Sequence, residues 1–203
     1  MSEVKKWNKL QEDTRQRMAQ IQSLFRQGKE IDAADTVTLL EGVIRAGDRI
    51  NIEGNNQKQA DFLAECLCKV DKEKINHLHM VQSAVPLAAH LELFERGIAE
   101  KLDFAYAGPQ SEHLATAIRE GKIKLGAIHT YLELFARYFI DLYPRVSLVT
   151  AYEADREGNL YTGFNTEDTP AIVEATKFRQ GIVIAQALSL IHISEPTRLA
   201  LSS

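Results

Sequence analysis

Apolar residues near the start of the chain recur every three or four positions, as they do along one face of a helix. These residues are Trp7, Leu10, Met18, Ile21, Leu24 and Phe25. They predict an amphipathic helix that ends at Gly28. A shorter helix is predicted after Asp35, a suitable N-cap, and is expected to stop near Gly47. We therefore expect residues 1–46 to form an N-terminal helical appendage.

From residue 47 onward, strand-like and helix-like patterns alternate. Residues 49–53 alternate between polar and apolar as a strand does, and a helical period follows at residues 63–70. Further strands are predicted at residues 75–81, 102–106, 123–125, 146–150 and 181–185, with helices between most of them. Alternation at this spacing is typical of a mostly parallel, doubly wound α/β sheet. We expect this domain to span residues 47–187.

Residues 151–161 interrupt the alternation. Their polar centre lies between extended flanks, which predicts a hairpin or a protruding loop. Asp155 can accept backbone hydrogen bonds, and Gly158 and Asn159 tolerate a positive φ. The segment therefore predicts a specific turn, although a solvated acidic turn would use the same residues.

The end of the chain differs from the rest. Residues 188–198 resemble the conceptual translation of a transposon adapter used to prepare sequencing libraries. We therefore expect residues 188–203 to be a non-native tail that contributes little to stability, and the natural protein to continue past Ala187.

The composition is that of an ordinary globular protein of 203 residues, 45% of them hydrophobic. Its 24 basic and 28 acidic residues create no basic field, so we expect no nucleic-acid partner. No apolar run reaches the roughly 18–20 residues of a membrane span, and we expect a cytoplasmic protein. Cys66 and Cys68 are two positions apart on a predicted helix, so they lie about 200° apart around it and cannot form a disulfide or share a metal.

The loop after the first predicted strand is the candidate site. In open α/β sheets, ligands bind at the carboxyl ends of strands, near the N-termini of helices. Gly54 would let the backbone approach a ligand closely, and Asn55 or Asn56 could cap the next helix or donate to an oxyanion. An ordinary connection between a strand and a helix would use the same residues.

The histidines offer a second set of candidates. His77 and His79 are expected to share a face of the second strand, but no third ligand with suitable spacing follows, so no metal site is predicted. His129 follows the fourth predicted strand, at the edge where ligands bind, and is a candidate for a supporting role. Motifs typical of serine hydrolases, P-loop NTPases and dinucleotide-binding domains are absent from the sequence.

Several blocks of sequence resemble a known family. Residues 154–160 and the helix that follows resemble the Ala-Asp-x-x-Gly-Asn hairpin region of class I CoA-transferases. Longer blocks resemble the malonate decarboxylase alpha subunit family, from about Trp7 to Gln186; they lie at residues 53–63, 78–81, 93–99, 106–111, 126–134 and 165–170. The resemblance implies a sheet of the CoA-transferase type.

The resemblance also implies a reaction and its partners. The expected reaction moves a carrier-protein thiol from acetate to malonate, and other subunits then decarboxylate the malonyl thioester. The implied partners are the acyl carrier protein subunit and other malonate decarboxylase subunits. No cofactor is expected to bind this chain directly, because the thiol belongs to the phosphoribosyl-dephospho-CoA group of the carrier protein.

In class I CoA-transferases, a glutamate attacks the thioester and backbone N–H groups stabilise the oxyanion. That glutamate lies in the second half of the fold, so we assign no nucleophile here and expect the chain alone to be inactive. Glu53 does not match the nucleophile motif. The resemblance places Gly54, Asn55 and Asn56 in the oxyanion loop, although they depart from the Gly-Gly-Phe-Gly pattern of class I enzymes.

In the hairpin, Gly158 and Asn159, together with Asp155, match the family motif in either a structural or a catalytic role. Two other functions stay open. One is a transferase like the citrate lyase alpha subunit, and the other is a non-catalytic α/β ligand-binding module. A sensor module would ordinarily carry a helix-turn-helix or a basic patch, and neither is predicted here.

Overall fold

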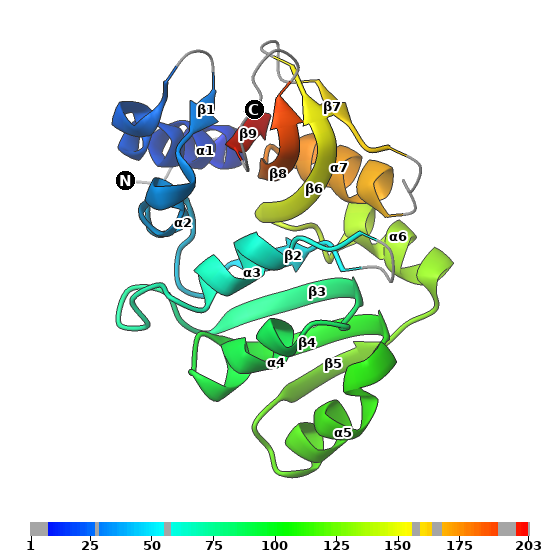
Figure 1. Cartoon of the computed structure of the whole chain (residues 1–203). Helices are drawn as coiled ribbons and strands as arrows, with labels where there is room; N and C mark the ends of the chain where they lie inside the picture. The colour runs from blue at the N-terminus through cyan, green and yellow to red at the C-terminus, as the bar shows by residue number, and fades with distance from the viewer. Residues whose placement is uncertain are drawn as a thin grey trace, which may run out of the picture.

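The alternating strands and helices fold into one sheet with helices on both faces (Figure 1). The computed structural model describes residues 8–26, 29–54, 58–155, 159–163, 168–190 and 198–202. Its helices are α1 (Lys9–Gln20), α2 (Thr36–Val43), α3 (Asp61–Leu67), α4 (Ala88–Glu95), α5 (Ser111–Arg119), α6 (Tyr131–Ile140) and α7 (Thr169–Phe178). Its strands are β1 (Glu30–Ile31), β2 (Arg49–Ile52), β3 (Leu78–Ala84), β4 (Ala99–Tyr106), β5 (Lys124–Ile128), β6 (Val146–Ala154), β7 (Leu160–Tyr161), β8 (Ile182–Leu190) and β9 (Arg198–Ser202).

The order of the strands shows where the chain changes direction. The order is β1-β9-β8-β6-β2-β3-β4-β5, and β7 pairs with β6 outside this path. Strands β2 to β5, β6 and β8 pair in parallel, while β1, β7 and β9 pair antiparallel. The chain builds from β2 out to β5 and then returns to β6 on the other side of β2. The predicted doubly wound sheet is confirmed, and its direction reverses between β2 and β6.

Two hydrophobic clusters cover the two faces of the sheet. Because side chains alternate along a strand, Ile50 and Ile52 face one cluster with α2, α3, α4 and α5. Val81 and Val149 face the other cluster, with Tyr138 of α6 and residues of α7. Figure 1 shows α3 and α4 in front of the strands and α6 and α7 to the right. The helices and these clusters therefore cover both faces of the parallel strands.

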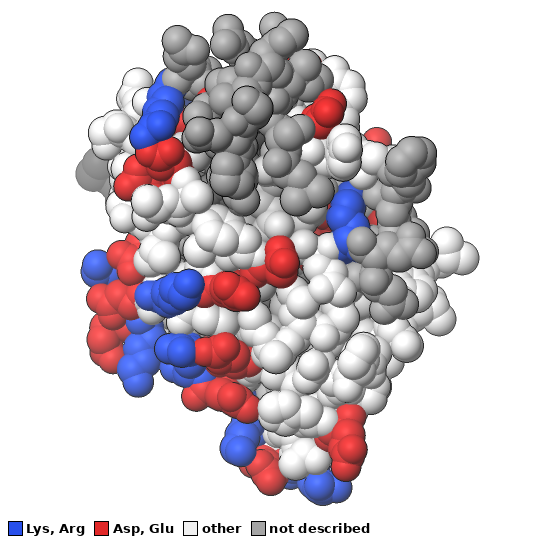
Figure 2. Space-filling view, in the orientation of Figure 1, with Lys and Arg blue, Asp and Glu red and all other residues white. Residues whose placement is uncertain are grey.

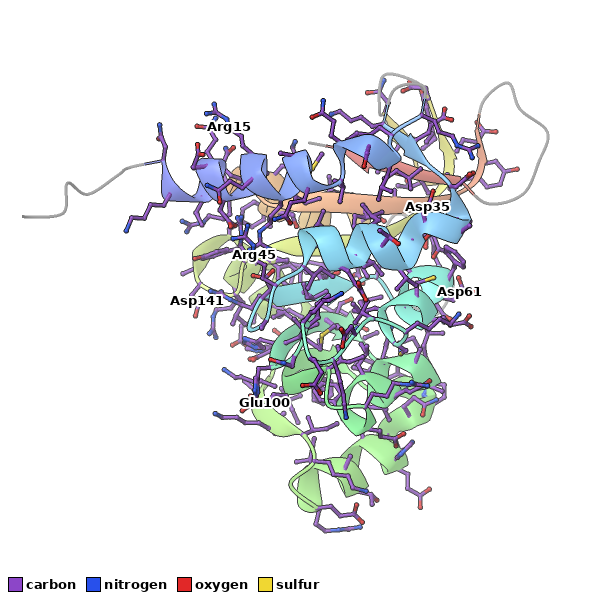
Figure 3. The ribbon with its side chains drawn as sticks, turned by 90° about the vertical axis from the view of Figure 1, so that its left-hand side faces the viewer. Arg15, Asp35, Arg45, Asp61, Glu100 and Asp141 are labelled. Carbon is purple, nitrogen blue, oxygen red and sulfur yellow. The ribbon has the colours of Figure 1, made fainter. Side chains whose placement is uncertain are left out.

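The two ends of the strands can be followed in Figure 3. Arg45 and Asp141, which precede β2 and β6, lie on one side of that view, while Asp61, which follows the loop after β2, lies on the other. The side with Asp61 is the carboxyl end of the strands, where ligands bind in open α/β sheets.

The N-terminal segment differs from its prediction at three points. Helix α1 ends at Gln20, well before Gly28, which lies outside the described residues. Asp35 is at the predicted N-cap position of α2, but its side chain makes no capping hydrogen bond. The segment also contains β1, which joins the sheet through β9. Buried Arg17 ties α1 to the domain, since it donates to the Val43 carbonyl at 2.8 Å and pairs with Asp48.

The C-terminal part also extends beyond the predicted pattern. The sequence places the end of the pattern near Ala187, yet the backbone of β8 continues to Leu190 and β9 pairs with both β8 and β1. An edge strand has unpaired N–H and C=O groups that an extended segment can satisfy. The segment boundaries at residues 46/47 and 187/188, and the non-native origin of residues 188–203, stay predictions.

Lys and Arg side chains are interspersed with Asp and Glu on the face shown in Figure 2. This mixture agrees with the nearly balanced composition of the chain. Within the ranges given above, no helix is both long and apolar enough to cross a membrane.

Candidate functional site

The two ends of the loop after β2 lie next to each other. Glu53 follows β2 directly, and its N–H donates to the Leu148 carbonyl of β6 at 2.8 Å. Its own carbonyl accepts from the Ala60 N–H at 2.9 Å, and Gly54 forms a bridge with Gln59. The two ends of the loop are therefore joined at the carboxyl end of β2, where the sheet reverses direction.

The Glu53 side chain has no solvent exposure and is held by three groups. It accepts from the Thr150 N–H at 2.7 Å, lies 3.2 Å from Lys58 Nζ and accepts from the Thr169 hydroxyl. A buried carboxylate is costly unless such partners surround it. We call Glu53, Lys58, Thr150 and Thr169 the Glu53 cluster.

Gln186 of β8 holds the start of the helix that follows the loop. Its amide nitrogen donates to Asp61 Oδ1 at 2.8 Å, and its amide oxygen accepts from the Leu63 N–H at 3.1 Å. Helix α3 begins at Asp61 with Ala60 at its N-cap. The prediction that Asn55 or Asn56 caps this helix is therefore wrong, because the chain runs on for several residues before it turns helical.

Gly54 is packed tightly rather than held in a left-handed conformation. Its φ is not positive, contrary to what a special turn would require. A Cβ at this position would lie 2.7 Å from His90 Cε1, 3.2 Å from Pro86 Cδ and 3.3 Å from the Ala84 carbonyl oxygen. Glycine is therefore needed because the loop lies directly against the connection between β3 and α4.

His90 forms the surface against which Gly54 packs. The residue is fully buried, and neither ring nitrogen has a hydrogen-bond partner among the residues that the structure describes. Burial lowers the pKa of His90 to about 3, so the ring is neutral near pH 7. Asn55 and Asn56 lie outside the described residues, so their oxyanion role stays a prediction.

The predicted hairpin is confirmed by the antiparallel pairing of β6 with β7. Asp155 closes its turn: the carboxylate accepts from the Asn159 N–H and from its side-chain amide, both at 2.8 Å. The Asp155 N–H donates to the Asn159 carbonyl at 3.1 Å. These contacts favour a structural role for both residues, while Gly158 lies outside the described residues. A catalytic role for the motif stays a prediction.

His77 and His79 do not share a strand face as predicted. His77 precedes β3 with φ 53°, and its ring lies 2.7 Å from Glu100. The chain turns through this left-handed residue immediately before the strand begins, which sends the two rings to different partners. His79 Nε2 instead lies 2.7 Å from Asp103 Oδ2.

His129 follows β5 as predicted, but it belongs to a cluster distinct from the Glu53 cluster. Its Nε2 lies 2.8 Å from Asp103 Oδ1 and its Nδ1 lies 3.1 Å from Glu133. We call His79, Asp103, His129 and Glu133 the Asp103 cluster. Burial raises the pKa of Asp103, but the hydrogen bonds with the two histidines outweigh it and lower the pKa to about 2. The part of the chain that the structure describes contains no group of three or more His, Cys, Asp or Glu able to hold a metal.

Sequence reasoning missed most partners of the buried carboxylates of Glu53 and Asp103. Thr169 is far from Glu53 in sequence, and no local pattern links them. A weak signal existed for Asp103, because an acidic residue between the apolar Leu102 and Phe104 of a buried strand requires a polar partner.

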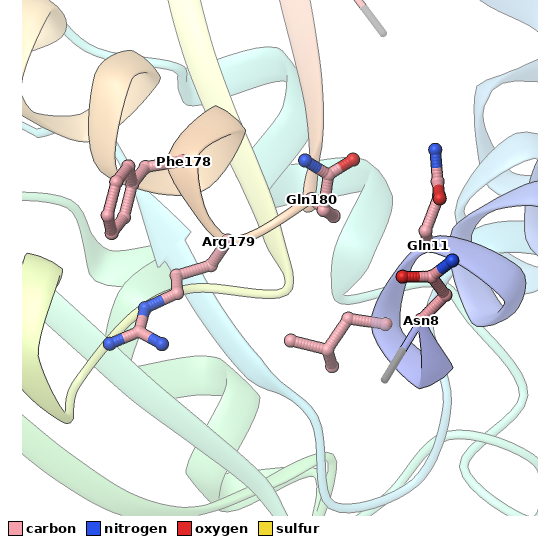
Figure 4. A pocket seen from close by; sticks show the side chains of 6 residues that line it. Asn8, Gln11, Phe178, Arg179 and Gln180 are labelled. Atoms are coloured by element: carbon pink, nitrogen blue, oxygen red, sulfur yellow. The ribbon is translucent and has the colours of Figure 1, made fainter. Parts of the chain in front are cut away.

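Away from both clusters, a hollow of about 260 Å³ lies between α1 and the residues at the end of α7 (Figure 4). Asn8 and Gln11 line it on one side, and Phe178, Arg179 and Gln180 on the other. Gln180 precedes β8, so the hollow lies at the amino end of the strands, opposite the Glu53 cluster.

Residues 6–198 match the model of a protein family described as "Malonate decarboxylase, alpha subunit, transporter". The chain belongs to the malonate decarboxylase alpha subunit family. The resemblance seen in the sequence is thereby confirmed.

Two family relatives are close in sequence. The acetyl-S-ACP:malonate ACP transferase of Malonomonas rubra is 67% identical over 191 residues, which are 94% of this chain and 34% of the relative. A chain of the Pseudomonas malonate decarboxylase hetero-tetramer, solved in complex with malonate, is 46% identical with a TM-score of 0.89. The match covers 95% of this chain and 35% of that one. The chain thus spans about a third of the length of these relatives.

A more distant structure shows the fold alone. Glutaconate coenzyme A-transferase from Acidaminococcus fermentans is 11% identical, with a TM-score of 0.58 over 77% of this chain and 66% of that one. The alpha subunit chain therefore has the predicted fold of the CoA-transferase type.

Proposed function

We propose that this alpha subunit chain is part of an enzyme that transfers a carrier-protein thiol from acetate to malonate. The observation that carries the proposal is the 67% identity with the Malonomonas rubra transferase across 94% of the chain. In the reaction, acetyl-S-carrier protein and malonate give malonyl-S-carrier protein and acetate. One thioester is broken and one is formed, so no oxidant or other co-reactant is needed.

The carrier protein and other decarboxylase subunits are the partners that we propose. The hetero-tetramer of the Pseudomonas relative supports assembly with further subunits. We further propose that the transferred thiol belongs to a phosphoribosyl-dephospho-CoA group on the carrier protein, and that the enzyme works in the cytoplasm.

The geometry of Glu53 supports a nucleophile from another part of the enzyme. Both carboxylate oxygens of Glu53 have partners, and the residue has no solvent exposure. A carboxylate that attacks a thioester must reach its carbonyl carbon with a free oxygen. Glu53 therefore serves as a fixed support, and we propose that the attacking glutamate lies outside these residues.

The segment of residues 54–59 after β2, which we call the Gly54 loop, is the part of this chain that we assign to the acyl group. It lies at the carboxyl end of β2, beside the reversal of the sheet, where open α/β sheets bind ligands. In that position, backbone N–H groups of residues 54–56 would stabilise the oxyanion of each tetrahedral intermediate.

A chimera tests the proposed function. Residues 7–186 of this chain replace the matching third of the Malonomonas rubra enzyme, and the product is assayed with acetyl-carrier protein and malonate. We expect malonyl-carrier protein, detected by mass spectrometry. The isolated chain is the control and should give none.

Two results would contradict the proposal. Transfer to citrate with none to malonate would favour a citrate lyase type of transferase. A folded chimera without any transfer would favour a ligand-binding module.

A further inference from the structure

Strand β2 leaves the sheet at Glu53, so the next N–H of the neighbouring strand β6, that of Thr150, needs an acceptor other than the backbone of β2. The Glu53 carbonyl is turned toward the Ala60 N–H, so it does not serve the neighbouring strand β6. The Thr150 N–H of β6 is buried and needs an acceptor. The Glu53 carboxylate supplies that acceptor at 2.7 Å, so a side chain continues the contact between β2 and β6 after the backbone has left.

Lys58 ties the loop back to the strand from which it starts. Its side chain is only 9% exposed, and its ammonium lies 3.2 Å from Glu53 Oε1. The same ammonium donates to the Thr169 hydroxyl, which in turn donates to Glu53. A nearly buried ammonium requires such a counter-charge, so Lys58 and Glu53 stabilise each other.

Three separate segments therefore meet at one carboxylate. Thr150 belongs to β6, Thr169 is the first residue of α7, and Lys58 lies near the end of the loop. Another contact joins the start of α7 to a different strand, since the Ser83 hydroxyl of β3 donates to Asp168, just before α7. A displacement of Lys58, at the end of the loop, would therefore break its pair with Glu53.

We propose that Glu53 is a positioning residue that holds the Gly54 loop in place through Thr150, Lys58 and Thr169. The inference rests on the proposed function for what the loop does in the reaction. Donors to an oxyanion act only when they are fixed at the position where charge develops, and a misplacement of about 1 Å can cost about 10²-fold in rate.

The test uses the chimera with Glu53→Gln, Lys58→Met and the double substitution. Glu53→Gln keeps the shape but removes the charge that Lys58 requires. Glu100→Gln is the matched control, because Glu100 is half exposed and contacts His77 in a distant part of the sheet.

We expect Glu53→Gln to lower kcat per folded molecule by about 10²-fold, with KM for malonate and for acetyl-carrier protein changed by less than about threefold. The double variant should lose less than the product of the two single losses, because it removes both members of the buried pair. Amide hydrogen exchange at Thr150 should become faster in Glu53→Gln. Glu100→Gln should match the unsubstituted chimera in every measurement.

Two results would overturn the positioning role. One is a kcat per folded molecule in Glu53→Gln within threefold of the unsubstituted chimera. The other is an acyl or thioester adduct mapped to Glu53 after incubation with acetyl-carrier protein, which would make Glu53 the nucleophile.

The failure of the proposed function would look different, since the unsubstituted chimera would itself show no transfer. The exchange measurement then decides the positioning role on its own. Unchanged protection of the Thr150 and Ala60 amides in Glu53→Gln would show that the carboxylate does not hold the loop.

Discussion

Two buried carboxylates in this sheet are held in different ways. Glu53 contacts a backbone N–H, a hydroxyl and an ammonium from segments that are far apart in sequence. Asp103 contacts two histidine rings, one on the adjacent strand β3 and one that directly follows the edge strand β5. The Glu53 cluster therefore links the end of β2 to β6 and α7, across the reversal of the sheet. The Asp103 cluster links the adjacent strands β3, β4 and β5.

The Asp103 cluster holds His129 between two carboxylates. Both ring nitrogens of His129 face carboxylates, which accept hydrogen bonds but cannot donate them. Gly126 makes room for the arrangement, because a Cβ there would lie 1.9 Å from Asp103 Oδ2. We therefore expect substitutions in the Glu53 cluster to change both activity and stability, and substitutions in the Asp103 cluster to change stability.

The largest effect on activity is expected at the loop beside Glu53. Gly54→Val would place a branched side chain where His90 and Pro86 already lie, and it would displace the backbone of the loop. Loss of one oxyanion donor costs about 10²–10³ in rate, so kcat of the chimera should fall by that amount. Near-normal turnover would mean that the loop is an ordinary connection between a strand and a helix.

A matched pair of variants separates packing from chemistry at this position. Gly54→Ala should destabilise the protein by about 1–3 kcal/mol through overpacking against His90. Adding His90→Ala should recover part of that loss, as measured by urea unfolding. The absence of any coupling between the two substitutions would show that the His90 ring and Gly54 are not in contact in solution.

The largest effect on stability is expected for Lys58→Met. The substitution leaves the Glu53 carboxylate buried without its cation, which typically costs about 3–5 kcal/mol. Urea unfolding of the chain should show a lower free energy of unfolding, and the double variant with Glu53→Gln should be less destabilised than the sum. Additive losses would contradict the buried pair.

The Asp103 cluster should respond to pH. The lowered pKa of Asp103, about 2 in the folded chain against about 3.8 in the unfolded one, stabilises the fold above pH 4. This contribution is about 2 kcal/mol and is lost as the pH falls through about 2. The difference in unfolding free energy between wild type and Asp103→Asn should therefore shrink by about half from pH 6 to pH 3. A difference that does not vary with pH would contradict the ionised Asp103.

The smallest effect is expected at the outer partner of His129. Glu133 has a half-exposed side chain, and water and salt screen its contact with the ring. Glu133→Gln should change the thermal midpoint by only about 1 °C. A much larger decrease would show that His129 depends on Glu133 as strongly as on Asp103.

The sequence alone predicted the order of elements and most of their positions. Strand β2 and the hairpin of β6 and β7 follow from local alternation and turn residues, so they needed no tertiary information. His77 was placed on a strand because its neighbours alternate, but its left-handed backbone conformation ends that pattern. The cap of α3 was misplaced because Asn55 and Asn56 are good caps wherever they occur.

The amino-acid sequence by itself determined the parallel α/β class, the family and the loop after β2 as the candidate site. Those features depend on periodicity and on blocks of neighbouring residues, which a sequence shows directly. Only the tertiary structure decided that Glu53 is enclosed by Lys58, Thr150 and Thr169, and that His129 belongs with Asp103 instead. The reason is that buried polar groups must find partners wherever the strand order brings them together. Residues 26, 97 or 116 positions apart carry no local signal of that meeting.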